Sequence, residues 1–218
     1  MISVLINKEK FKIPTSWSDV MYSQWQQIQN EKDEIKILSI ITNIPTDLLI
    51  NFNQGQLEKI EALLIFLQTP FDFDNIGKPV NPIDIKRQSW GKRIEAEQIL
   101  RNKSDDIDGI VKCYDVDINS PIIEVFEIVL DIIEQLKEII ETEAKELSVE
   151  PTREQRLAGV SMYEEFGVMN TIRAVAQGNI LNFDKVLEIE YNVVFIYLKM
   201  AKTDSIFQTN YQKVLNKK

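Results

Sequence analysis

The sequence contains no histidine, a single cysteine and only seven glycines among its 218 residues. Without histidine, the base that most often activates a serine or cysteine nucleophile is missing, and so is the Glu-x-x-His pattern of di-iron helical bundles. The glycines, at positions 55, 77, 91, 109, 159, 167 and 178, do not cluster into a phosphate-binding loop. These absences predict a protein that is not an enzyme and has no bound cofactor.

Cysteine, apolar runs and targeting signals are equally scarce. Cys113 has no second cysteine in the chain with which to form a disulfide, as is typical of proteins from a reducing compartment. The first residues, Met1 to Ile6, lack the basic region and the long apolar run of a signal peptide. No run reaches the roughly 18 uncharged apolar residues of a membrane span. We therefore expect a cytoplasmic site of synthesis and no membrane partner.

Positive charge is also in short supply, because 25 lysines and arginines face 34 acids, for a formal net charge of -9. That balance opposes binding to nucleic acid, since affinity for the phosphate backbone depends on cationic side chains. The imbalance is local: residues 104–150 hold fourteen acids and three bases. We expect this segment to produce most of the electrostatic field of the molecule.

What the sequence does contain is helical periodicity, which predicts a mainly α-helical fold with a small amino-terminal β-hairpin. The hairpin is expected over 1–14, with a polar turn at residues 7–10. Helices are expected from the capping residues at 15–18 to about Asn30, and then over 34–42, 56–68, 90–102, 106–114, 122–147, 151–178 and from Asn182 past Thr203. Thr152 and Gln155 have the spacing of a capping box. The predicted domains are a hairpin and short-helix module at 1–70, a proline-containing linker or strand at 71–88, and a bundle of long amphipathic helices at 89–218.

One stretch has partial metal-binding spacing. Asp115, Asp117 and Asn119 match the opening of an EF-hand loop, but Ser120 stands where glycine is needed and Phe126 where a bidentate glutamate is needed. A solvated acidic loop before a capped helix explains the pattern better, so we expect no metal site.

Two sets of side chains are candidates for contact with other molecules. Phe71, Phe73 and Trp90 lie in or beside the proline-containing segment, and aromatic side chains are common anchors of protein interfaces. The polar side of the helix expected over 122–147 carries a row of acids that would form either the lining of a channel or a solvated face. These acids are Glu124, Glu127, Asp131, Glu134 and Glu138.

Several segments resemble proteins of tailed bacteriophages. The runs Ile13-Pro14-Thr15-Ser16-Trp17-Ser18-Asp19-Val20 and Ile37-Leu38-Ser39-Ile40-Ile41-Thr42-Asn43-Ile44-Pro45 are similar to small phage proteins in which a hairpin leads into a helix. The carboxyl-terminal residues Phe166-Gly167, Ile172, Ala176, Gly178-Asn179, Asp184, Val186 and Tyr191 resemble helical phage assembly proteins. Trp90-Gly91-Lys92-Arg93-Ile94-Glu95 is similar to a segment of crassvirus-like phages.

The resemblance implies a role in virion morphogenesis, and two roles compete. One is a ring-forming head–tail connector or tail component that stays in the virion, contacts the portal and neighbouring ring or tail proteins, and allows DNA to pass through a homo-oligomeric ring. The other is a tail assembly chaperone that binds tail or tape-measure proteins transiently. The acidic segment favours the ring, because a like-charged wall does not retain DNA, whereas a chaperone should display an apolar groove. A host helical protein-interaction module is a third alternative, since helical bundles serve many functions.

Overall fold

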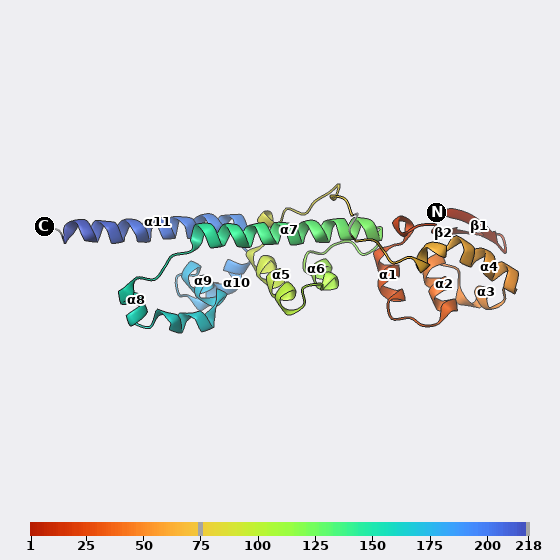
Figure 1. The fold of residues 1–218 in the computed structure, drawn as a ribbon, viewed down its shortest axis with the longest axis horizontal. Helices are drawn as coiled ribbons and strands as arrows, with labels where there is room; N and C mark the ends of the chain where they lie inside the picture. Colours follow the sequence, from red (N-terminus) through yellow and green to blue (C-terminus); the bar gives the residue numbers. More distant parts are fainter. Residues whose placement is uncertain (74–75, 217–218) are drawn as a thin grey trace. The chain divides into compact units, whose positions relative to one another are not determined.

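The computed structural model describes residues 1–73 and 76–216 and confirms a mainly α-helical chain with an amino-terminal hairpin (Figure 1). The strands are β1 (Ile2–Ile6) and β2 (Glu9–Ile13). The α-helices are α1 (Tyr22–Ile28), α2 (Glu34–Thr42), α3 (Thr46–Ile50), α4 (Gln54–Leu63), α5 (Trp90–Asn102), α6 (Ile107–Cys113), α7 (Ile122–Leu147), α8 (Arg153–Leu157), α9 (Val168–Val175), α10 (Phe183–Leu187) and α11 (Tyr191–Leu215). Short 3-10 turns occupy Trp17–Asp19, Ile65–Gln68, Ile85–Arg87, Val160–Phe166 and Ile180–Asn182.

The hairpin is tighter than expected. Its strands pair antiparallel from Ile2 opposite Ile13 to Ile6 opposite Glu9, so only Asn7 and Lys8 remain for the turn. Both turn residues have positive φ angles, 49° and 73°. Two-residue turns of this kind match the right-handed twist of the strands, and asparagine tolerates the left-handed conformation well. The four-residue turn predicted at 7–10 is therefore wrong, because the twist of the strands favours two residues.

The chain forms two compact units, and α7 contributes to both. Unit 1 contains residues 1–82 and 115–131, and unit 2 contains residues 83–114 and 132–218. The division differs from the boundaries expected at 70 and 88, because residues 115–131 belong with the amino-terminal module. Backbone hydrogen bonds cause this: Ile122 N donates to Val20 O at 2.8 Å, and Tyr22 N donates to Ser120 O at 3.0 Å.

Unit 1 packs α1 to α4, the hairpin and the start of α7 around one apolar core. Its fully buried side chains are Ile13, Val20, Tyr22, Ile41, Ile44, Leu49, Ile122, Val125, Phe126 and Val129. The helix expected from 15 to Asn30 is shorter in the structure. Residues 20 and 21 are extended there, since they pair with the segment before α7, and α1 begins only at Tyr22.

Unit 2 surrounds the second half of α7 with α5, α6 and the carboxyl-terminal helices. Its core contains Ile85, Trp90, Ala96, Ile110, Ile132, Leu136, Ile139, Ile172 and Val194. The start of α5 is tied to the start of α11, because Trp90 N donates to Ile189 O at 2.7 Å and Tyr191 N donates to Gln88 O at 2.9 Å. Ser89 also caps α5 through its hydroxyl, which accepts from Lys92 N at 3.3 Å.

Three expectations for the connecting segments are corrected. The single helix predicted over 151–178 is divided into α8, a 3-10 turn and α9, because Gly159 and Gly167 adopt positive φ angles of 82° and 46°. The last helix is also divided, since residues 189 and 190 leave the helix to pair with the start of α5. The described residues within 71–88 contain no β-strand, and Ile85–Arg87 form a 3-10 turn there.

Candidate interaction surfaces

An aromatic cluster in unit 1 is centred on Phe126 of α7, which is 1% exposed. Its ring lies within 6 Å, centroid to centroid, of four others: Trp25 at 5.4 Å, Phe71 at 5.2 Å, Phe73 at 4.9 Å and Tyr22 at 5.9 Å. Three of these pairs are edge-to-face and the Phe71 pair is stacked, and both geometries add to the free energy gained by burying apolar area. The cluster therefore anchors the chain around residues 71–73 to α7.

A mostly apolar hollow of about 560 Å³ opens beside this cluster. Its lining comes from the 3-10 turn at Trp17–Asp19, from α1 and α2, and from the segment after α4. The lining residues are Trp17, Trp25, Ile28, Gln29, Ile37, Leu67, Pro70, Phe71 and Phe73. The indole Nε1 of Trp17 donates to Thr69 O at 3.1 Å, which holds one wall in place. Such a hollow can accept an apolar side chain from another protein.

The three aromatic residues predicted at an interface lie in different environments. Phe73 is 49% exposed and Phe71 is half-buried, and both line the apolar hollow. Trp90 is 3% exposed in the core of unit 2, so its side chain is not on a surface. The resemblance of the Trp90 segment and its position after the prolines gave no indication of burial. The prediction of an interface therefore applies only to Phe71 and Phe73 and no longer to Trp90.

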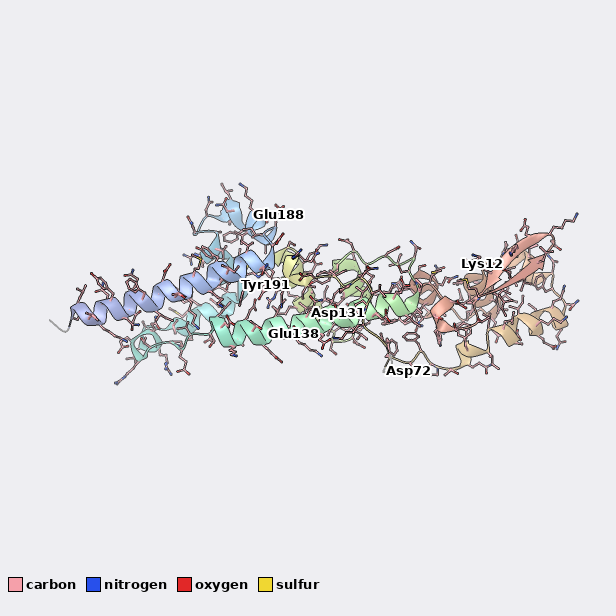
Figure 2. All side chains as sticks on the ribbon, turned by 90° about the horizontal axis from the view of Figure 1, so that it is seen from above. Lys12, Asp72, Asp131, Glu138, Glu188 and Tyr191 are labelled. Atoms are coloured by element: carbon pink, nitrogen blue, oxygen red, sulfur yellow. The ribbon has the colours of Figure 1, made fainter. Side chains whose placement is uncertain are left out.

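The acids expected on one side of α7 are at least partly accessible. Glu124, Glu134 and Glu138 are exposed, whereas Glu127 and Asp131 are half-buried. Figure 2 marks Glu138 on this helix. The opposite side of α7 supplies core residues to both units, as the spacing of its apolar residues predicts.

Unit 2 contains a buried ionic network that the sequence did not reveal. Arg93 on α5 is 5% exposed; its Nη1 lies 2.8 Å from Glu97 and its Nη2 lies 2.5 Å from Glu143 on α7. Burial raises the pKa of Glu143 above its ordinary value, although the Arg93 charge opposes the shift. Tyr191, labelled in Figure 2 at the start of α11, hydrogen-bonds to Glu143, and burial and that carboxylate raise its pKa.

A hollow of about 500 Å³ opens along this network, between α5 and α7. Ile94, Ile140, Ala144 and Leu147 give it apolar walls, and the salt-bridged Arg93 lies at its side. Glu97 and Glu143 pair with Arg93, and Glu97 also pairs with Arg101 in the lining, so both guanidinium groups of the hollow are already bound to carboxylates and it is not suited to a small anion. The small side chain of Ala144 instead leaves room for a bulky apolar group.

The outer side of α11 carries large apolar side chains exposed to solvent. Met200, Phe207 and Val214 are each 60% exposed or more. From residue 203 to residue 216 every described residue is exposed, so this part of the helix has no packing partner in the part of the chain that the structure describes. Figure 1 shows α11 running past the end of α7. An apolar face turned to solvent is typical of a protein interface.

Further exposed apolar side chains lie on the shorter elements of unit 2. They are Leu157, Met162, Tyr163, Phe166, Met169, Ile180 and Leu181. Five of them lie within 151–178, where the sequence predicts one continuous helix. The divided helix leaves them on the surface and enlarges the apolar area of unit 2.

The described residues hold neither a metal-binding cluster nor a membrane-spanning helix. Among residues 1–73 and 76–216, no three acids, cysteines or histidines are placed to hold a metal ion. Asp117 uses its carboxylate to accept from Asn119 N at 2.9 Å, which shapes the acidic loop before α7. No helix in the same part of the chain is long and apolar enough to cross a membrane.

Comparisons with protein-family models, with curated proteins and with solved structures found no match for this chain.

Proposed function

We propose that the chain is a non-enzymatic structural subunit of a tailed-phage virion, a ring-forming head–tail connector or tail component. The observation that carries the proposal is the apolar outer side of α11, where Met200, Phe207 and Val214 are exposed along an otherwise regular helix. A helix whose apolar side faces water is stabilised when another protein covers it.

The charge distribution supports the ring in particular. The exposed acids Glu124, Glu134 and Glu138 give α7 a negative side, which would not retain DNA that passes along it. No enzymatic step and no cofactor is part of the proposal. The partners would be further copies of the chain, the portal and neighbouring ring or tail proteins.

Quantitative mass spectrometry of purified virions tests the proposal. A structural subunit should occur in the mature particle at a copy number close to that of the portal protein. Absence of the chain from virions, with abundance in infected cells, would contradict the proposal.

That contrary result would favour the second candidate, a tail assembly chaperone. The observation in favour of a chaperone is the apolar hollow lined by Trp17, Ile37 and Phe71, which can accept an apolar segment of a client. Co-purification of a tail or tape-measure protein from infected cells should then depend on this hollow. Ile37→Glu should abolish the co-purification, whereas Lys36→Glu, at an exposed neighbouring position, should leave it unchanged.

A further inference from the structure

Six exposed apolar residues of α11, together with Asp204, form a seam with the alternating four-and-three spacing of a coiled coil. The seam residues are Val193, Tyr197, Met200, Asp204, Phe207, Tyr211 and Val214. At a rise of 1.5 Å per residue the α11 seam is about 30 Å long. Lys202 projects from the other side of the helix, where it donates to Glu146 O at 2.8 Å and Ser148 O at 2.9 Å. The seam therefore faces away from the chain's own α7.

A second seam with the same spacing lies on α7. Ile133, Lys137, Ile140, Ala144 and Leu147 follow one another at intervals of four and three residues. Lys137, Ile140 and Ala144 are exposed, and the other two are half-buried. This α7 seam borders the hollow of about 500 Å³ along α5. A helix laid along it would bury apolar side chains on both partners.

The charges of the two seams are complementary. The α11 seam contains one charged residue, Asp204, on a helix whose other charged residues, among those described, are lysines. The α7 seam contains one charged residue, Lys137, between the exposed acids Glu134 and Glu138. Apposing the two seams pairs Asp204 with Lys137. Apposing two α11 seams in register would instead place Asp204 against Asp204, which is unfavourable.

The sizes of the side chains fit the same register. With Asp204 opposite Lys137, the residue opposite Ala144 is Tyr211 if the helices run parallel and Tyr197 if they run antiparallel. In either direction a large ring meets the smallest side chain of the α7 seam, beside the hollow. Large side chains entering spaces left by small ones are how helices achieve close packing.

We infer that α11 of one copy of this chain docks on the α7 seam of a second copy. The two surfaces differ, so each copy can offer α11 to one neighbour and α7 to the other, and such contacts close into a ring when the rotation permits. The inference rests on the proposed function, because it assigns the contact between neighbouring subunits of the proposed ring.

The first test compares the full-length chain with two neighbouring substitutions, by sedimentation velocity over a concentration series. Phe207→Glu should weaken self-association at least about tenfold, because it places a charge in the buried seam. Ile206→Glu is the matched control: Ile206 is 48% exposed on the same helix but outside the seam. It should change the dissociation constant by less than about threefold. A monomeric wild-type chain, or equal effects of the two variants, would overturn the inference.

The second test is a charge exchange that identifies the partner helix. Asp204→Lys and Lys137→Glu should each weaken self-association by about tenfold, and the double variant should recover to within about threefold of the wild type. Recovery cannot arise from a general loss of folding. An unaffected Lys137→Glu variant, or a double variant no better than the single ones, would overturn the α11–α7 contact.

The outcomes separate the contact from the proposed function. If the charge exchange fails while virions contain the chain at the copy number of the portal, the contact is wrong and the structural role stands. If the exchange recovers association while virions lack the chain, the contact stands and the structural role fails.

Discussion

Replacing Phe126 by alanine should destabilise unit 1 strongly, because this ring is the centre of the aromatic cluster. Phe126 is 1% exposed and lies within 6 Å of the rings of Tyr22, Trp25, Phe71 and Phe73. Removing a buried phenylalanine costs roughly 3–5 kcal/mol, from lost transfer free energy and the cavity left behind. With four aromatic neighbours unable to close that cavity, we expect about 4 kcal/mol.

Urea denaturation followed by tryptophan fluorescence measures this loss, since the ring of Trp25 lies 5.4 Å from that of Phe126. At an m-value of about 2 kcal/mol/M, the midpoint should fall by about 2 M. Phe166→Ala is the matched control, because Phe166 is 53% exposed, lies outside the α11 helix, and its removal should cost less than about 0.5 kcal/mol. A loss below about 1.5 kcal/mol for Phe126→Ala would refute the view that this cluster holds residues 71–73 on α7.

Three further predictions concern unit 2. Arg93→Met should cost about 3–5 kcal/mol in urea denaturation, since it leaves Glu143 partly buried without its cation; a loss below about 1 kcal/mol would contradict the network. The raised pKa of Glu143 means that, between its ordinary and its raised pKa, the folded chain holds a proton that the unfolded chain has lost. The melting temperature should therefore fall as the pH rises through this interval. Glu143→Gln should flatten this decline, and an unchanged pH profile would refute the assignment. Gly109→Ala should destabilise by about 1–2 kcal/mol, because its Cβ would lie 2.7 Å from Ile99 Cγ2. Gly55→Ala, on α4 of unit 1, is the comparison: its Cβ would meet its nearest atom at 3.7 Å, so the variant should be more stable by up to about 1 kcal/mol. Thermal melts of both variants measure the two changes in stability.

Local signals in the sequence were sufficient for several elements. The helix predicted over 90–102 is α5 with both ends as expected, because Ser89 caps it and the apolar spacing is regular. The capping box is also confirmed, since Thr152 N donates to Gln155 Oε1 at 2.8 Å and Gln155 N donates to Thr152 Oγ1 at 3.2 Å. Such features depend on residues within one turn of one another.

Features set by distant contacts could not be predicted in this way. The break before Tyr191 arises because residues 189 and 190 pair with the start of α5, a partner about 100 residues away in the sequence. The buried position of Arg93 depends on Glu143 of another helix. Nothing in either local segment indicates these pairings.

The candidate surfaces show the same limit. An apolar spacing on α11 is visible in the sequence, yet it is equally typical of a helix side that faces a core. Only the structure shows that Met200 and Phe207 face solvent, whereas Trp90 is buried. Periodicity indicates that a side is apolar, and tertiary packing decides whether that side remains exposed.

The native mass of the full-length wild-type chain tests the central claim, that copies of this protein assemble with one another into a ring. Native mass spectrometry at tens of micromolar should give one discrete mass, an integer multiple of the 25.3 kDa chain. The same mass should be absent for Phe207→Glu and retained for Ile206→Glu. A wild-type chain that remains at 25.3 kDa at every concentration would contradict the account.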